Sequence, residues 1–236
     1  MNNKIKNIQN ELNRLSNREI AEHSQRFFKT GKGEYGERDK FLGIRVPLLR
    51  QLAKKYKGIS INEATLLLKS QFHEERLLSL FILTELYRAA DIQGKKEIYN
   101  LYLSNTRFIN NWDLVDTSAE HIVGAFLWKR NKKPIYDLAI SQNLWKRRIS
   151  IMSTFHFIKR NDFKDALKAS EILLHDKEDL IHKSVGWMIR EIGKRNLKIV
   201  EEFLEKYYKK MPRIMLQYAI EKFPKSKRQK YLKRSI

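Results

Sequence analysis

The chain has 236 residues, of which 42% are hydrophobic and 11% aromatic, enough apolar material to bury a sizeable core. The absence of cysteine excludes disulfide frameworks, cysteine-ligated zinc, iron–sulfur clusters and thiol nucleophiles. Residues 1–16 lack the apolar core of a signal peptide, and no segment approaches the roughly 20 apolar residues of a membrane helix. We therefore expect a cytoplasmic protein that does not associate with membranes.

The net charge of +21 is unevenly distributed along the chain. Residues 1–118 carry 20 basic and 14 acidic side chains, whereas residues 119–236 carry 28 and 13. Solubility requires a net charge of only about 2 to 8 on a small domain, so a well-solvated surface is the weaker explanation. A field of this sign attracts polyanions, among which nucleic acid is the commonest soluble one.

Helices are expected along nearly the whole chain. Glycine and proline are scarce, apolar residues recur with a period near 3.6, and alternating β-branched runs are almost absent. In residues 59–69, for example, Ile61, Ala64, Thr65 and Leu68 share one face, and Ser60 or Asn62 can cap the helix. The expected breaks fall at residues 30–36, 57–58, 93–94, 131–134, 160–162, 193–196 and 211–212. The fold class predicted is all-α.

A repeat of 36 residues connects Arg76, Trp112, Arg148 and Ser184, and a related segment follows at Arg213. Each of these residues is expected near the start of a helix. A period in this range, with two helices per unit, is typical of helical solenoids such as HEAT arrays. The sequence thus predicts one domain over residues 1–236, with about 20 N-terminal and about 10 C-terminal residues peripheral. Basic residues at the helix starts would line its concave surface.

Residues 110–118 are expected to begin a helix that continues to residue 127, with Asn110 or Asn111 as its N-cap. Asp116 follows Trp112 by four residues, so the carboxylate and the indole share a face, whereas Asp113 points about 100° away. An indole beside a carboxylate is suited to holding a cation. Both carboxylates could instead serve simply to complement the helix dipole.

Two further tryptophans each precede an arginine by three residues: Trp145 precedes Arg148, and Trp187 precedes Arg190. Large aromatic residues in helical repeats usually pack in the core, and this is the alternative for both. Gly186, immediately before Trp187, would let another group approach the backbone. Arginines at helix starts are suitable donors to phosphate oxygens.

The sequence resembles the AlkD-type DNA alkylation-repair glycosylases from about residue 20 to residue 225. Five segments carry the resemblance in matching order: Phe41–Pro47, Trp112–Asp116, Trp145–Arg148, Gly186–Glu191 and Tyr218–Phe223. The resemblance implies a right-handed superhelix of HEAT-like repeats with a basic concave groove. It also implies excision of purines alkylated at N3 or N7 from duplex DNA, the first step of base excision repair.

Carried over by position, the resemblance assigns the catalytic carboxylate to Asp116 and the flanking aromatic pair to Trp112 and Trp187. It assigns a DNA contact to Arg148. The other residues expected to bind DNA are Arg45, Lys146, Arg147, Lys183, Arg190 and Arg213. Two features depart from the family: Arg45 stands where some members have Gln, and Asn110-Asn111 precede Trp112 where a bulky residue can occur. These departures concern lesion preference.

No cofactor or metal is expected. Gly31-Lys32-Gly33 lacks the earlier Gly and the Ser or Thr of a P-loop, and the segment from His73 to Leu77 lacks the second His of a zincin helix. The six histidines share no ligand spacing, so ordinary core or surface roles are expected for them. No lysine stands out as a Schiff-base nucleophile, which favours a monofunctional glycosylase over one with lyase activity. The protein is expected to be a monomer.

Two alternatives of other classes stay open. The first is a non-catalytic HEAT-like protein that binds DNA by shape and phosphate contacts, although such a protein has no reason to keep the set of Trp112, Asp116, Arg148 and Trp187. The second is a scaffold for an acidic protein. DNA binding that weakens steeply as salt rises would argue against that scaffold.

Overall fold

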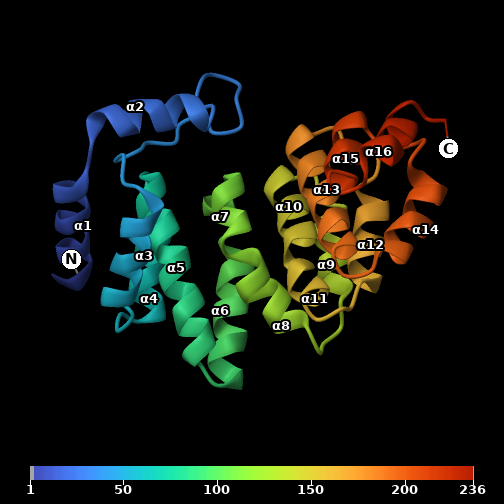
Figure 1. Ribbon diagram of the computed structural model, residues 1–236. Coiled ribbons are helices and arrows are strands. Elements are labelled where there is room, and N and C mark those ends of the chain that lie inside the picture. Colours follow the sequence, from blue (N-terminus) through green and yellow to red (C-terminus); the bar gives the residue numbers. More distant parts are fainter. Residues whose placement is uncertain (1–2, 236) are drawn as a thin grey trace. The chain divides into compact units, whose positions relative to one another are not determined.

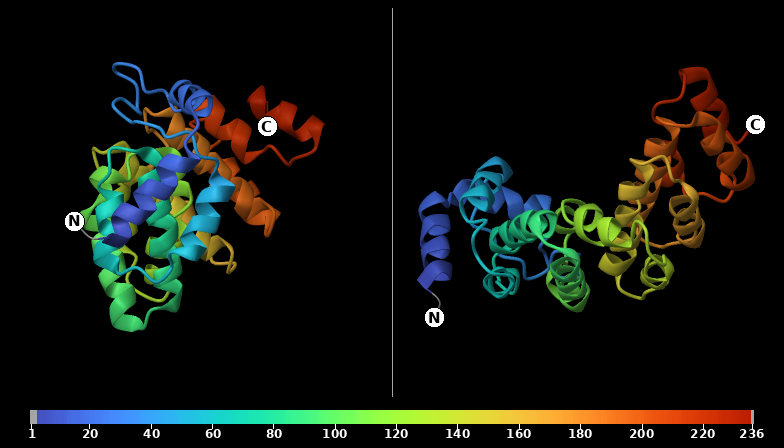
Figure 2. Two further views of the ribbon diagram at one scale, coloured as in Figure 1. Left: turned by 90° about the vertical axis from the view of Figure 1, so that its left-hand side faces the viewer. Right: turned by 90° about the horizontal axis from the view of Figure 1, so that it is seen from below.

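The computed structural model describes residues 3–235, and these form helices joined by loops (Figures 1 and 2). Within this range no strand is present, and Lys40 and Phe72 form an isolated β-bridge. The prediction of an all-α fold is confirmed. The superhelical shape stays a prediction. Across residues 3–235, no helix combines the length and the apolar character needed to cross a membrane.

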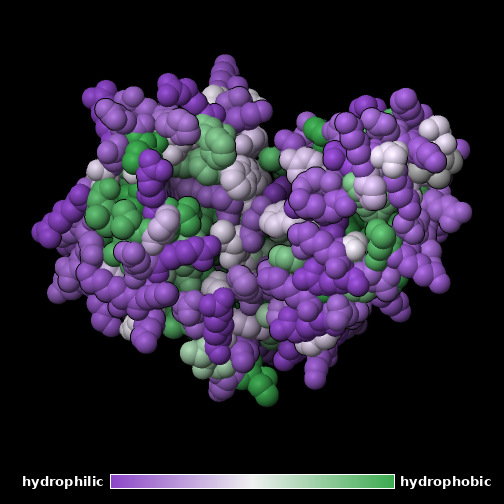
Figure 3. Space-filling model, viewed as in Figure 1, coloured by the Kyte–Doolittle hydropathy of each residue, from purple (hydrophilic) through white to green (hydrophobic). Residues whose placement is uncertain are grey.

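The chain divides into two compact units at the boundary between Ser118 and Ala119. The second unit, residues 119–236, carries the larger excess of basic side chains, 28 basic against 13 acidic. Hydrophilic residues cover most of the face of each unit seen in Figure 3. Assignment of residues 1–236 to a single domain stays a prediction.

Unit 1 is arranged around one long helix, α5, which contacts the helices before and after it in the chain. The residues from Leu77 to Leu83 are all buried, so α5 presents apolar side chains on every side. The N-terminal helix α1 also contributes to the core, because Ile5, Ile8 and Leu12 are buried. The helices of unit 1 are α1 (Asn3–Leu15), α2 (Arg18–Phe27), α3 (Val46–Lys55), α4 (Ile61–Leu68), α5 (His73–Ala89), α6 (Ile92–Ser104), the 3₁₀ helix η1 (Thr106–Phe108) and α7 (Trp112–Asp116).

Unit 2 has its helices in two rows. Helices α10, α13 and α15 pack side by side in chain order, and α9, α12 and α14 pack against them. This pairing agrees with the predicted repeat of two helices. The helices of unit 2 are the π-helix η2 (Glu120–Gly124), α8 (Ala125–Leu127), α9 (Lys133–Ala139), α10 (Leu144–Ser153), α11 (Phe155–Ile158), α12 (Lys164–Ile172), α13 (Asp179–Gly193), α14 (Leu197–Tyr207), α15 (Arg213–Ala219) and α16 (Lys225–Leu232).

The helix ends follow from local chemistry. The predicted helix at residues 59–69 is α4, and its cap is Ser60: the hydroxyl accepts from the Glu63 backbone at 3.2 Å, and the Glu63 carboxylate accepts from the Ser60 backbone at 2.7 Å. This capping box satisfies two amides that the helix leaves without partners. All four prolines lie at the cap or within the first two positions of a helix, where a missing N–H costs nothing.

The prediction of one regular helix over residues 110–127 is wrong. Helix α7 ends at Asp116, and the chain turns before the π-helix η2 and the short α8. The hydroxyls of Thr117 and Ser118 donate to the carbonyls of Asp113 at 2.7 Å and Leu114 at 2.5 Å. Hydroxyls that bond back to the preceding turn bend helices, and this explains why α7 stops.

Candidate active site and DNA interface

Helix α7 of unit 1 carries the predicted carboxylate and one predicted indole. The Asn111 side chain caps it by accepting from the Trp112 amide at 2.8 Å, so of the two expected caps the structure selects Asn111. Trp112 and Asp116 are the first and last residues of this helix and lie about one turn apart. Asp113 lies between them, and its Oδ1 accepts from the Leu114 amide at 2.8 Å.

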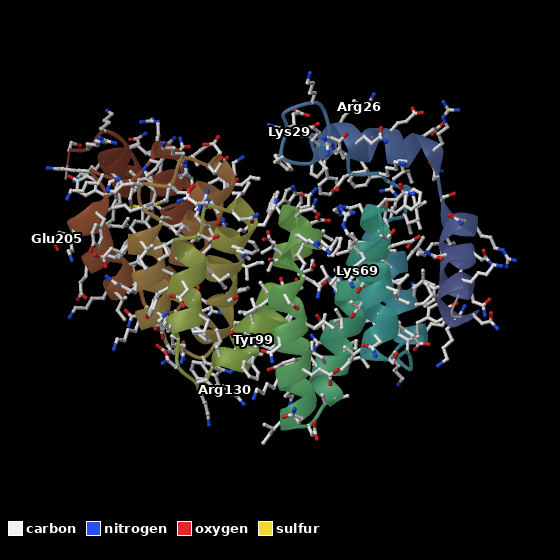
Figure 4. The ribbon with its side chains drawn as sticks, turned by 180° about the vertical axis from the view of Figure 1, so that it is seen from behind. Arg26, Lys29, Lys69, Tyr99, Arg130 and Glu205 are labelled. Carbon is white, nitrogen blue, oxygen red and sulfur yellow. The ribbon has the colours of Figure 1, made fainter. Side chains whose placement is uncertain are left out.

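Trp112 belongs to an aromatic cluster that includes two residues from the end of α2. Its ring stacks on Phe28 with centroids 5.3 Å apart and meets the edge of Phe27 at 5.9 Å. Trp112 is half-buried, and Phe27 is 57% exposed. Exposed basic residues adjoin the two phenylalanines in the chain: Arg26 and Lys29 project from the end of α2 and the loop after it (Figure 4). Trp112 therefore has an aromatic support from Phe27 and Phe28.

Asp116 is half-buried and lies outside the apolar core. Burial raises the pKa of Tyr102, and the negative charge of Asp116 adds to that increase, which places the carboxylate within electrostatic reach of α6. The Tyr102 hydroxyl in turn bonds to Ser118 at 2.9 Å. A partly accessible carboxylate one turn from an indole is the arrangement that the sequence predicts.

The predicted residues of unit 2 all lie on one row of helices. Helices α10, α13 and α15 carry every one of them, and α9, α12 and α14 carry none. The row holds Lys146, Arg147 and Arg148 on α10, Lys183, Trp187 and Arg190 on α13, and Arg213 on α15. The spacing of the sequence repeat therefore brings these residues onto adjacent helices.

The three basic residues of α10 differ in their surroundings. Lys146 is half-buried. Arg147 pairs with Asp176 at 2.6 Å and donates to the carbonyl of Ser141 at 3.0 Å. Arg148 is 5% exposed, and its guanidinium donates to the carbonyl of Leu180. In this structure Arg148 joins α10 to the start of α13, and its contact with phosphate stays a prediction.

The expectation that the basic residues of the repeat gather on an exposed surface is wrong for Arg148, which is buried, and for Arg76. Its exposed fraction is 4%, and its guanidinium pairs with Asp39 at 2.8 Å. A guanidinium this buried requires a carboxylate partner, and Asp39 of the 28–45 loop supplies it. Arg76 is a structural residue of unit 1.

On α13, Trp187 is half-buried and lies beside Phe155, with ring centroids 6.0 Å apart. Its indole Nε1 donates to the carboxylate of Glu191 at 3.2 Å. Gly186 permits a close approach, as predicted, but the group that approaches is the neighbouring helix. A Cβ at this position would lie 2.5 Å from the carbonyl oxygen of Met215 on α15.

The remaining residues predicted to bind DNA either lie near the start of a helix or pair with an acidic side chain. Arg190 of α13 donates to Glu221, which follows α15. Arg213 begins α15, is exposed, and donates to the carbonyl of Leu232 at 3.3 Å. Lys183 of α13 is half-buried. Arg45 is exposed at the N-cap of α3.

Sequence reasoning missed the role of His73, which was expected to be ordinary. His73 lies between two carboxylates: Nδ1 is 3.4 Å from Asp39 and Nε2 is 2.7 Å from Asp113. Four consecutive charged residues, from His73 to Arg76, directly before an apolar run would have indicated buried charge pairing. The same residues do not form a metal site, and no group of three metal-ligating side chains occurs among residues 3–235.

These features define an all-helical protein built from packed helix pairs, with basic and indole residues along one row. The chain belongs to the family of DNA alkylation repair enzymes, because the sequence model of that family matches residues 8–223. Membership in this family implies that the protein binds DNA.

Two solved structures resemble this fold. A predicted DNA alkylation repair enzyme from Enterococcus faecalis aligns with a TM-score of 0.68 and 17% identity, over 89% of this chain and 97% of that one. AlkD2 from Streptococcus mutans aligns with a TM-score of 0.57 and 21% identity, over 88% of this chain and 98% of that one. At these identities the likeness concerns the fold. A comparison with curated protein sequences finds no significant match.

Proposed function

We propose that this protein is a monofunctional DNA glycosylase that hydrolyses the N-glycosidic bond of purines alkylated at N3 or N7 in duplex DNA. The observation that carries the proposal is the pair on α7: a half-buried carboxylate, Asp116, one turn from a half-buried indole, Trp112. Family membership supplies the setting, because these enzymes repair alkylated DNA.

The chemistry follows from the charge of the lesion. Alkylation at N3 or N7 makes the purine cationic, so the base leaves with the electrons of the C1′–N bond and needs no strong acid. The sugar then acquires oxocarbenium character, which the carboxylate of Asp116 stabilises. A water oxygen bonds to C1′ and loses a proton, and the products are a neutral alkylated base and an abasic site. The indole face of Trp112 favours the cationic groups of the substrate.

In this proposal unit 2 supplies a second aromatic residue, Trp187, and contacts to the DNA backbone. Arg148, Arg190 and Arg213 are the arginines assigned to phosphate, with Lys146, Arg147 and Lys183 on the same row of helices and Arg45 contributed by unit 1. Arginine forks match phosphate oxygens bidentately. The excess of positive charge in residues 119–236 supports this assignment of roles.

Base release from methylated duplex DNA tests the proposal. We expect the wild-type protein to release 7-methylguanine or 3-methyladenine under single-turnover conditions, and Asp116→Asn to lower that rate by about a hundredfold or more while duplex affinity is kept. Asp137→Asn is the matched control, because Asp137 is an exposed residue of α9 paired with Lys133. An Asp116→Asn protein as fast as the wild type would overturn the assignment.

Base release and duplex binding, measured together, separate the two alternative functions. A wild-type protein that binds duplex DNA in a salt-dependent manner and releases no base would be the non-catalytic DNA-binding protein. Absence of salt-dependent DNA binding would indicate the acidic-protein scaffold.

A further inference from the structure

The first turn of α5 places four consecutive charged residues inside unit 1. His73, Glu74, Glu75 and Arg76 are exposed by 2%, 3%, 4% and 4%. Buried charges are costly unless each is paired or hydrogen-bonded, so four in a row require a dedicated set of partners. Those partners come from different segments, which makes this turn a junction of unit 1.

Two of the four residues, Glu74 and Glu75, bind segments of unit 1 other than α7. The carboxylate of Glu74 accepts from the backbone amides of Leu42 at 2.9 Å and Gly43 at 2.8 Å. The carboxylate of Glu75 accepts from the side chain of Gln9 on α1 at 3.0 Å. These contacts secure the loop before α3 and the N-terminal helix. They involve no residue of α7.

His73 makes the connection to α7. Its Nε2 donates to Asp113 on α7 at 2.7 Å, and its Nδ1 faces Asp39 of the 28–45 loop at 3.4 Å. Asp39 also accepts from Arg76 at 2.8 Å, and the Asn111 side chain lies 3.4 Å from it. Two cationic and two anionic side chains thus balance in this network when the imidazole is protonated.

The charges around His73 favour its protonated form. Burial by itself disfavours the cation, but the carboxylate of Asp113 and the hydrogen bonds to Asp113 and Asp39 raise the pKa of His73 to about 9, against the opposing charge of Arg76. The carboxylates that lower the cost of the cation come from the loop and from α7, and the guanidinium comes from α5 itself. The imidazolium is therefore the form at neutral pH.

The same ring also supports the aromatic cluster. Phe41 stacks on His73 with centroids 4.7 Å apart, and Phe28 lies 5.0 Å from it. Phe28 also stacks on Trp112, with ring centroids 5.3 Å apart. His73 consequently reaches Trp112 by two routes, one through the Asp113 carboxylate and one through the Phe28 ring.

We propose that His73 is a positioning residue for the reaction: its imidazolium bridges Asp39 and Asp113 and thereby sets where α7 presents Trp112 and Asp116. This inference rests on the proposed function of Asp116. Helix α7 has only five residues, and isolated helices of this length are unstable in water. Its position therefore depends on contacts with the rest of unit 1. Asp113 serves in this role as the point at which the bridge meets the helix, beyond the helix-dipole role expected for it.

The test compares His73→Gln with Glu75→Gln in the full chain. Both residues lie in the first turn of α5 and are almost fully buried, but Glu75 contacts α1 rather than α7. We expect His73→Gln to lower the single-turnover rate of base release by about tenfold or more, because small displacements of a catalytic group are costly. Duplex affinity should stay within about twofold, and Glu75→Gln should stay within about twofold in both measurements. Rates are normalised to the folded fraction.

A second measurement works without catalysis, and its first part needs no variant. In ¹⁵N NMR spectra of the wild-type protein at about pH 7.5, both ring nitrogens of His73 should carry protons. The Trp112 indole signal should move in His73→Gln and stay in place in Glu75→Gln. A neutral His73, an unmoved Trp112 signal, or equal rates in the two variants would overturn the inference. If the wild-type protein releases no base, the proposed function fails, and the NMR results still decide whether the bridge positions α7.

Discussion

The indole Nε1 of Trp187 donates to Oε1 of Glu191, one turn later on α13, at 3.2 Å. Glu191 is buried, and its carboxylate also accepts from Lys194 at 2.6 Å and lies 3.5 Å from Arg195. Burial alone would raise the pKa of Glu191, but the hydrogen bonds from Lys194 and Trp187 and the charges of Lys194 and Arg190 outweigh it and lower that pKa. The carboxylate is therefore a fixed anionic acceptor that orients the indole.

Replacing this acceptor should release the Trp187 ring. We expect Glu191→Ala to lower the free energy of unfolding by about 1–3 kcal/mol, because the half-buried indole N–H of Trp187 loses its acceptor and the hydrogen bond from Lys194 to the buried carboxylate is lost. The chain has four tryptophans, so ¹H–¹⁵N spectra should contain four indole signals, and the one absent from Trp187→Phe should shift in Glu191→Ala.

Glu205→Ala is the control, because Glu205 is exposed on α14 (Figure 4). It should change the free energy of unfolding by no more than about 0.5 kcal/mol and leave all indole signals in place. An unshifted Trp187 signal in Glu191→Ala would show that packing against Phe155, and not the carboxylate, holds the ring.

Two glycines of α13 should respond oppositely to alanine. At Gly186 a Cβ would lie 2.5 Å from the Met215 carbonyl oxygen and 2.5 Å from the Cβ of Tyr218, so α13 and α15 would have to separate. We expect Gly186→Ala to destabilise the protein by about 1–3 kcal/mol, the usual cost of overpacking. Urea unfolding followed by circular dichroism measures the change.

Gly193, the last residue of the same helix, is the matched control. There a Cβ would meet Val200 at 3.6 Å, an ordinary contact. Gly193→Ala should be neutral or stabilise the protein by up to about 1 kcal/mol, because alanine loses less chain entropy in a helix. Equal destabilisation in both variants would mean that the approach of α15 does not explain why residue 186 is glycine.

The helices were predictable from the sequence, because their signals are local. Capping of α4 by Ser60, the cap of α7 and the absence of strands from residues 3–235 all follow from side chains within a few residues of the backbone they affect. The early end of α7 was harder to predict from the sequence. It depends on the hydroxyls of Thr117 and Ser118, which donate to backbone carbonyls of the preceding turn.

The sequence predicted which residues belong to the candidate site better than it predicted which residues those side chains contact. Arg148 and Ser184 are 36 residues apart and fall on the adjacent helices α10 and α13, and the related segment at Arg213, 29 residues later, begins the next helix of the row, α15. The bridge from Asp39 to Asp113 spans 74 positions of the chain and depends on the path of the 28–45 loop. No local pattern encodes such a pairing, which is why His73 was missed.

Glu74 should be among the most sensitive positions of unit 1. Its buried carboxylate accepts from three successive amides, at 2.9 Å from Leu42, 2.8 Å from Gly43 and 3.3 Å from Ile44. We expect Glu74→Ala to cost about 3 kcal/mol or more, because it leaves buried N–H groups without acceptors. Glu74→Gln keeps one carbonyl oxygen and should cost less. Chemical denaturation measures both.

Glu85→Ala provides the comparison on the same helix, because Glu85 pairs at the surface with Arg88 at 2.6 Å. Exposed pairs of this kind contribute about 0–1 kcal/mol. If Glu74→Ala were no more harmful than Glu85→Ala, the anchoring of residues 42–44 by Glu74 would be refuted.

The histidines His73 and His156 should give the free energy of unfolding opposite dependences on pH. Burial, together with the charges of Arg160, His121 and Lys159, lowers the pKa of His156 to about 4 from an ordinary value of 6.5. The folded state then favours the neutral ring. The stability that results is present above pH 6.5 and is lost as pH falls toward 4. The difference between wild type and His156→Gln should therefore shrink in acid.

For His73 the direction reverses, because its pKa is raised to about 9 in the folded protein. The folded state favours the imidazolium, so its stabilisation is complete below pH 6.5 and disappears as pH rises to about 9. The difference in free energy of unfolding between wild type and His73→Gln should fall by up to about 3 kcal/mol over that range, as measured by urea unfolding at several pH values. A difference that stayed constant up to pH 9 would mean that the His73 ring is neutral, in which case Asp39 and Asp113 would share the single charge of Arg76. Such an arrangement would raise the pKa of one of the two carboxylates and so destabilise the protein in acid instead.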